Sequence, residues 1–198
     1  MSTPTRRRLS GDDRRDEIGR AARKLFATNG YHATTTRQLA QAAGVSDALL
    51  YRHFANKQDL LEFVVNEAIG TFSTLPPLDR MTGLDTHELL RRLGDGFLDR
   101  ITTNIDLVLI LISEHSGLVD VRFATFIDTA ASALGDDLAR RGAATDAYDG
   151  YLAARSFFGS LMSFVLLQRV LGMDSVRTID TTAYLGHLVE QTAKRSRG

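Results

Sequence analysis

Residues 39–54 constrain the fold most, because they encode two short helices joined by a tight turn. Gly44 stands in the middle, and glycine adopts a positive φ without the steric cost that other residues bear. Ala40 offers a small side chain where the second helix crosses the first, and Val45 and Leu50 give the second helix an apolar face. This pattern is typical of a helix-turn-helix, whose second helix enters the major groove of DNA.

Helices are also predicted on both sides of this turn. Apolar residues between positions 18 and 26 recur at i, i+3, i+4, i+7 and i+8, the spacing of an amphipathic helix. The threonine run at 34–36 offers a cap for the next helix, Ser46 offers one for the third, and Asn56 offers one for a fourth. Asp59 then falls at the N3 position of that fourth helix.

The rest of the chain is predicted to be helical as well. The sequence Leu75-Pro76-Pro77 must interrupt any helix, because proline lacks the amide donor and has a fixed φ. Beyond it no alternating strand pattern appears, and helical patterns lie near 86–101, 103–116, 118–141, 145–172 and 177–194. The predicted fold class is therefore all-α with about nine helices.

Three segments are predicted along the chain. Residues 1–10 form a disordered basic tail, 11–57 an N-terminal three-helix helix-turn-helix DNA-binding domain, and 58–198 a larger helical domain for ligand binding and dimerisation. The tail contains Arg6, Arg7 and Arg8. We interpret it as a solvated tail, with an arm in the minor groove of DNA as the alternative.

Charge is distributed unevenly, although the net charge is +0. Residues 1–60 contain 11 Lys and Arg against 6 Asp and Glu, whereas residues 61–198 contain 13 against 18. A basic head on an acidic body is expected when one end of a protein meets DNA.

The chain has 0 Cys, which excludes thiolate metal sites and cysteine nucleophiles. Because it also lacks a phosphate-binding loop and a nucleophile elbow, nothing in it indicates an enzyme.

The run from Ile18 to Leu61 resembles the DNA-binding domain of the TetR family of transcriptional regulators. The resemblance implies a homodimer, an operator with two-fold symmetry, and repression that a small ligand in the C-terminal domain relieves. It covers about a quarter of the chain and rests on Ile18-x-x-Ala21-Ala22-x-x-Leu25-Phe26, Gly30-Tyr31, Thr34-Thr35, Leu39-Ala40-x-x-Ala43-Gly44-Val45-Ser46, Leu50-Tyr51-x-His53-Phe54 and Lys57-x-x-Leu60.

Eleven residues are predicted to contact DNA. Hydroxyl, imidazole and ammonium donors suited to phosphate are Thr35, Thr36, Ser46, Tyr51, His53 and Lys57. Candidates for base edges are Arg37, Asp47, Ala48, Leu49 and Arg52. Family members contact DNA through the residues that match Thr36, Arg37, the recognition helix, Tyr51, His53 and Lys57.

Two of these positions have electrostatic features of their own. Lys57 stands at a helix start, where a cation is locally unfavourable, and this suggests a phosphate partner. Asp47 departs from the expected pattern because its carboxylate at the head of the recognition helix repels phosphate. It either accepts a hydrogen bond from a cytosine amino group or only caps the helix, so the base preference stays open.

The C-terminal body contains bulky side chains that fill a core or line an apolar pocket. Glu114 and His115 are adjacent on a helix and point about 100° apart, so we expect no metal site and no cofactor. The residues predicted to line a site for a mainly apolar ligand are Phe97, His115, Phe123, Phe126, Tyr151, Arg155, Phe157, Phe158 and Met162. Further candidates are Glu114, Arg122 and Phe164.

The pattern at 145–172 is apolar on more than one side, and one domain of this size hardly buries such a helix. Gly159, Ser160 and Ser163 permit another helix to approach closely. We therefore predict that the last two helices pair with their copies as a four-helix dimer interface.

The alternative to a ligand-released repressor is a regulator without a small ligand, controlled by a partner protein or by abundance. Without a membrane span, a cytoplasmic, nucleoid-associated location is expected.

Overall fold

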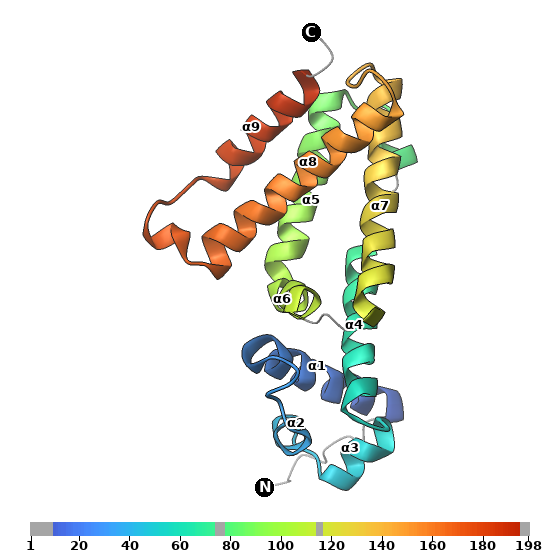
Figure 1. The fold of residues 1–198 in the computed structure, drawn as a ribbon, viewed down its shortest axis with the longest axis vertical. Coiled ribbons are helices and arrows are strands. Elements are labelled where there is room, and N and C mark those ends of the chain that lie inside the picture. The colour runs from blue at the N-terminus through green and yellow to red at the C-terminus, as the bar shows by residue number, and fades with distance from the viewer. Residues whose placement is uncertain (1–9, 74–77, 114–116, 195–198) are drawn as a thin grey trace, which may run out of the picture. The chain divides into compact units, whose positions relative to one another are not determined.

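The computed structural model describes residues 10–73, 78–113 and 117–194, and these residues form helices and connecting turns without a strand (Figure 1). The all-α prediction is confirmed. The α-helices are α1 (Gly11–Asn29), α2 (Thr36–Ala42), α3 (Asp47–His53), α4 (Lys57–Ser73), α5 (Thr86–Thr103), α6 (Ile105–Ser113), α7 (Gly117–Arg140), α8 (Ala147–Val165) and α9 (Thr181–Lys194). Shorter elements are η1 (Leu78–Met81), the π-helical η2 (Leu166–Val170) and η3 (Met173–Ser175).

The predicted caps and turn of the helix-turn-helix are present. Thr35 accepts a hydrogen bond from the Gln38 amide at the start of α2, and Ser46 accepts one from the Leu49 amide at the start of α3. Gly44 has φ of 65°, in the left-handed region that favours glycine. The Val45 amide donates to the carbonyl of Ala40 at 2.9 Å, which closes the turn between the two helices.

The chain forms two compact units, Met1–Thr71 with Asp106–Asp120, and Phe72–Ile105 with Val121–Gly198. The first unit therefore extends beyond the boundary expected at residue 57. Its extra members are most of α4, whose Leu60, Leu61 and Val64 are buried, and α6. The expected break at Leu75-Pro76-Pro77 lies outside the described residues.

The first unit is built around α1 and α4. Ile18 and Phe26 of α1 are buried with Leu50 of α3, and α2 and α3 lie on the same side of α1 (Figure 1). Gly19 lets α1 and α4 approach closely, because a Cβ there would stand 2.3 Å from a ring carbon of Phe63. Tertiary packing thus supports two helices that are only seven residues long.

In the second unit, α5, α8 and α9 pack against one another. A Cβ on Gly94 of α5 would stand 2.4 Å from Leu185 of α9 and 3.1 Å from Phe157 of α8. Gly135 of α7 and Gly150 of α8 are in closer contact still, since a Cβ on Gly150 would meet the carbonyl oxygen of Gly135 at 2.2 Å. Glycines therefore set both helix crossings.

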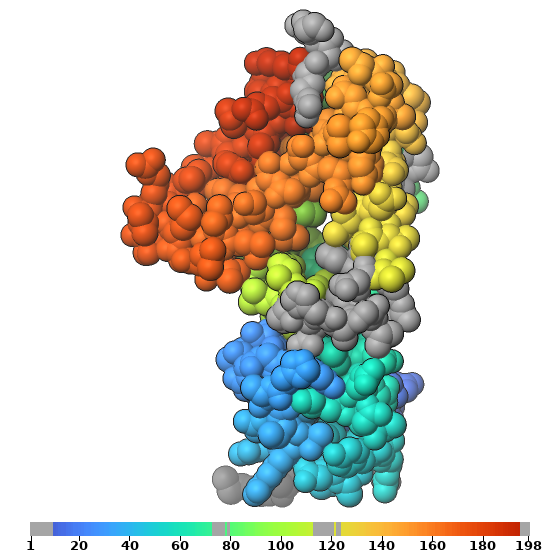
Figure 2. Space-filling model, viewed as in Figure 1, coloured from blue at the N-terminus to red at the C-terminus, as the bar shows by residue number. Residues whose placement is uncertain are grey.

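The predicted long helix at 145–172 is α8, which continues as η2. Among the described residues, Ala147–Val170 is the one stretch long and apolar enough to span a membrane, and the core helix of a soluble protein passes the same test. Phe157 and Leu161 are buried, whereas Tyr148 and Leu152 lie on the exposed side. Figure 2 shows α8 (orange) and α9 (red) with their outer surfaces uncovered on the viewed face.

Candidate nucleic-acid interface

Helix α3 presents most of its length to solvent. Its anchor is Leu50, which is 3% exposed, and Leu49 beside it is half-buried. On the outer side Tyr51 is 50% exposed, although large aromatic side chains are usually covered. The other exposed residues of this region are Asp47, Ala48 and Arg52. The exposed surface of α3 is thus mixed in chemistry, with an anion at its start and a cation near its end.

Helix α2 contributes fewer exposed groups. Arg37 is exposed, whereas Thr36 is half-buried. The Thr35 hydroxyl is already engaged in a capping box, since it accepts from the Gln38 amide and donates to the Gln38 side-chain oxygen at 2.9 Å. Ser46 likewise caps α3. These two hydroxyls therefore have a structural role that is independent of any phosphate.

Lys57 begins α4, but its ammonium group points into the fold. The Nζ donates to the carbonyl oxygens of Tyr31 at 2.8 Å and of Thr34 at 2.9 Å. It also lies 4.2 Å from the centroid of the Tyr31 ring, where a cation is attracted to the face of the aromatic system. The local misfit of a cation at a helix start is thus offset within the protein itself.

Arg15 of α1 is a functional candidate that the sequence reasoning missed. Its Nη1 donates to the carbonyl oxygen of His53, the last residue of α3, at 3.0 Å. Its guanidinium lies 4.5 Å from the ring centroid of Phe54, which is buried, and its Nη2 lies 3.8 Å from Asp59. A signal was available, because Arg15 precedes Ile18 by three positions and so continues the apolar stripe of α1.

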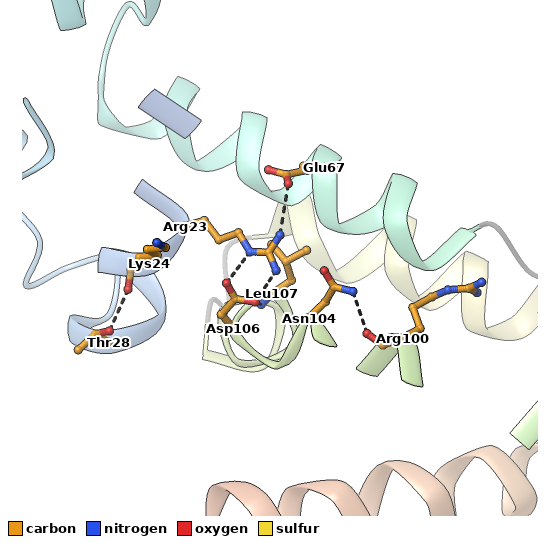
Figure 3. A network of polar contacts seen from close by, with 8 residues as sticks. All are labelled: Arg23, Lys24, Thr28, Glu67, Arg100, Asn104, Asp106 and Leu107. Carbon is orange, nitrogen blue, oxygen red and sulfur yellow. Dashed lines mark hydrogen bonds and ion pairs between the residues drawn. The ribbon is translucent and has the colours of Figure 1, made fainter. Parts of the chain in front are cut away.

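Arg23 is a second cation of α1 with partners inside the first unit (Figure 3). Its Nε and Nη2 each lie 2.5 Å from one oxygen of Asp106 in α6, and its Nη1 lies 3.3 Å from Glu67 in α4. The hydrogen bonds that Arg23 donates to the Asp106 carboxylate raise the pKa of Arg23 further above its ordinary value. One side chain thus joins three helices of this unit.

The surplus charge of the first sixty residues therefore has two uses. Arg15, Arg23 and Lys57 donate to acceptors within the fold, whereas Arg37 and Arg52 are exposed. Only exposed cations are available to displace counterions from DNA without rearrangement. Arg6, Arg7 and Arg8 lie outside the described residues.

In the body, the predicted ligand residues fall into two groups. Phe157 is buried, and the half-buried rings of Phe97 and Phe158 lie 4.9 Å apart between α5 and α8. Tyr151 donates to Asp128 at 2.9 Å, and this hydrogen bond raises the pKa of its hydroxyl. The guanidinium of Arg155 lies 6.0 Å from the Tyr151 ring. The structure thus places along α8 an aromatic cluster with Phe97 of α5 and a polar group with Asp128 of α7.

The remaining predicted ligand residues lie elsewhere in the body or outside the described residues. Phe126 and Met162 are half-buried. His115 and Glu114 lie outside the described residues, and so do the side chains of Phe123 and Arg122. In the parts of the chain that the structure describes, no group of three His, Cys, Asp or Glu side chains could hold a metal ion.

Known proteins resemble this chain both in sequence and in fold. Residues 18–64 match the model of a family described as "Bacterial regulatory proteins, tetR family". The transcriptional regulator YvkB of Bacillus subtilis is 32% identical over 101 residues, which are 51% of this chain and 52% of YvkB. The activator FasR of Mycolicibacterium smegmatis is 29% identical over 150 residues, 74% of this chain and 68% of FasR. The chain thus spans about half the length of YvkB and two thirds of that of FasR.

Solved structures show the same fold over most of the chain. The regulator FadR from Bacillus subtilis, solved in complex with stearoyl-CoA, superposes with a TM-score of 0.69 at 20% identity, covering 90% of this chain and 97% of FadR. NalD of Pseudomonas aeruginosa, the secondary repressor of a multidrug efflux pump, superposes with a TM-score of 0.65 at 22% identity. The superposition covers 92% of this chain and 96% of NalD. At these identities the likeness concerns the fold.

Proposed function

The chain belongs to the TetR family of transcriptional regulators, and from this premise we propose that it is a homodimeric repressor which a mainly apolar ligand releases from a palindromic operator. The observation that carries the proposal is the exposed face of α3, anchored from behind by buried Leu50. Members of this family are regulators and not enzymes, so the site is one of binding. Action on DNA would place the protein in the cytoplasm, at the nucleoid.

The proposed DNA contacts divide by exposure. Arg37 and Arg52 suit guanine edges or phosphates, while Ala48 and Leu49 suit thymine methyl groups. Asp47 would disfavour phosphate and select against bases that present only acceptors. Phosphate contacts are proposed for Thr36, Tyr51 and His53, with Thr35 and Ser46 acting chiefly as caps. For Lys57, the two internal carbonyl bonds support a different role, which is argued below.

Dimerisation through α8 and α9 is supported by small residues on their outer surfaces. A Cβ placed on Gly159 of α8 or on Gly186 of α9 would meet nothing within 4 Å in the single chain. Tyr148 and Leu152 lie along the same helix as Gly159 and are 70% and 40% exposed. Covering these side chains would remove apolar surface from water, and each buried aliphatic side chain contributes about 1.5–3 kcal/mol.

An apolar ligand is supported by the aromatic cluster of Phe97, Phe157 and Phe158, and by FadR, which shares the fold and was solved with stearoyl-CoA. Control by a partner protein or by abundance remains the alternative, because bulky rings also suit a filled core. Repression is the favoured direction, although FasR is described as an activator and KstR2 of the same organism as a repressor.

The test is selection of binding sites from random duplex DNA with the purified full chain at two salt concentrations. A palindrome with half-sites about one helical turn apart is expected, because two recognition helices of a dimer fit successive major grooves about 34–36 Å apart. Enrichment of a single half-site would contradict the dimer, and salt-sensitive background binding alone would contradict specific recognition. Light scattering at micromolar concentration checks the dimer independently of DNA.

A further inference from the structure

The two helices of the helix-turn-helix are too short to hold their own geometry. Each has seven residues, and isolated helices shorter than about 12–15 residues are marginal in water. Within helix α3 Leu50 is the one fully buried side chain, with Leu49 and His53 half-buried, so packing covers only part of its length. Its direction therefore depends on what holds its ends.

The C-terminal end of α3 is held by Arg15. The His53 carbonyl lies in the last turn, where the helix offers no amide donor, and Arg15 of α1 supplies one from 38 positions away. The guanidinium is itself fixed, because it lies over the buried ring of Phe54 and 5.3 Å from the ring centroid of Phe63. A cation at this end also interacts favourably with the helix dipole.

The turn that leads into α2 is fixed by hydrogen bonds from Lys57. Its two acceptors, the carbonyls of Tyr31 and Thr34, belong to the turn that joins α1 to α2. Thr35, the next residue, caps α2. The ammonium therefore fixes the backbone immediately before the helix-turn-helix begins, just as Arg15 fixes it where the motif ends.

We propose that Arg15 and Lys57 are positioning residues, which clamp the two ends of the helix-turn-helix at Thr34 and His53 and so set the direction in which α3 reads DNA. This inference rests on the proposed function for its biological meaning. It assigns Lys57 a role within the fold in place of a phosphate contact. Arg37 and Arg52, by contrast, are exposed residues, whereas the side chain of Arg15, although 40% exposed, is held by the His53 carbonyl and the Phe54 ring.

Salt dependence separates the two roles. A cation that neutralises a phosphate changes the slope of log K against log salt by about 0.9 when it is removed. A positioning residue leaves this slope unchanged and acts on the ratio of specific to non-specific affinity, because only base readout needs a correctly aimed α3. Simple loss of folded protein would lower both affinities by the same factor.

The experiment measures binding of Arg15→Lys and Lys57→Met proteins to the duplex that the wild-type protein enriches, and to a shuffled duplex, over a range of salt. Arg15→Lys keeps the charge but loses the planar group that both donates to His53 and stacks on Phe54. Specific affinity should fall roughly tenfold, the factor that corresponds to one charged hydrogen bond, with the slope unchanged and non-specific affinity altered less than about threefold.

Arg52→Met serves as the matched control, since it removes an exposed cation from α3 and should make the slope shallower by about 0.9. Wild-type affinity in Arg15→Lys would overturn the proposal for Arg15. A slope change in Lys57→Met equal to that of Arg52→Met, with the specificity ratio unchanged, would overturn it for Lys57.

Amide hydrogen exchange of the free protein tests the same clamps without DNA. Residues 46–54 should exchange roughly tenfold faster in Arg15→Lys, and residues 34–42 faster in Lys57→Met, because local opening becomes easier. Arg52→Met should leave both regions as in the wild type. Unchanged exchange in both clamp variants would refute the inference. Faster exchange in a protein that enriches no duplex would instead refute the proposed function and leave the clamps supported.

Discussion

Arg23 of α1 and Asp106 of α6 form a two-bond pair in which both nitrogen–oxygen distances are 2.5 Å (Figure 3). Asp106 is the only ionisable residue within α6, whose other described side chains are mainly apolar. The side chain of Arg23 is 17% exposed and that of Asp106 is 30% exposed, so the pair is partly shielded from water. This pair gives α6 a specific polar attachment within the first unit.

Replacing Asp106 by Asn should destabilise the protein by about 1–3 kcal/mol, because hydrogen bonds to charged groups contribute that much when partly buried. Thermal and urea unfolding measure the loss. Glu67→Gln is the control, since Glu67 lies 3.3 Å from Arg23 and is 35% exposed, and its pair should contribute about 0–1 kcal/mol. Equal losses in the two variants would mean that the short Arg23–Asp106 bonds add nothing beyond an exposed ion pair.

The crossing of α7 and α8 should not accept a side chain at Gly135. A Cβ there would stand 2.5 Å from the backbone nitrogen of Tyr151, and backbone cannot yield as a flexible side chain can. We expect Gly135→Ala to cost about 1–3 kcal/mol of stability. Gly96→Ala in α5, where nothing lies within 4 Å, should instead stabilise by roughly 0.5–1 kcal/mol. Denaturant midpoints that move in the same direction for both would contradict the close approach.

The turn of the helix-turn-helix should depend on backbone conformation at Gly44 and not on space. No atom lies within 4 Å of a Cβ built there, but φ is +65°. Gly44→Ala should therefore cost roughly 1–2 kcal/mol, the penalty of a left-handed conformation for an ordinary residue. Gly44→Asn should cost less, since asparagine visits this region more readily. If Asn proves no better than Ala in thermal unfolding, the strain argument is wrong.

If α8 lies in the dimer interface, a charge introduced on its exposed apolar side should disrupt the dimer, whereas a charge at an exposed apolar position on another helix should not. Leu152→Glu on α8 should convert the dimer to a monomer, because a carboxylate would be buried without a partner between two copies. Val121→Glu on α7 alters a residue that is 69% exposed and should leave the mass unchanged. Light scattering at several concentrations measures both. A dimer that tolerates Leu152→Glu would place the interface elsewhere.

Local features of the first sixty residues followed from sequence because they involve neighbours three or four positions apart. Thr35 and Ser46 cap α2 and α3 through amides three residues ahead, and Asn56 accepts from the amide of Asp59 in the same way. Gly44 takes a positive φ for reasons within its own residue. The number and order of the described helices followed equally from apolar periodicity.

Local sequence patterns thus specify the helices, the caps of the helix-turn-helix and its tight turn, and residues 18–64 carry the resemblance to the TetR family. Only the tertiary structure decided which cations face outward, because Arg15, Arg23 and Lys57 find acceptors 38, 83 and 26 positions away. It also decided that α6 belongs with the first unit, although its neighbours in sequence, α5 and most of α7, belong to the second. Periodicity reports which side of a helix is covered, whereas the identity of the covering group depends on how distant segments pack.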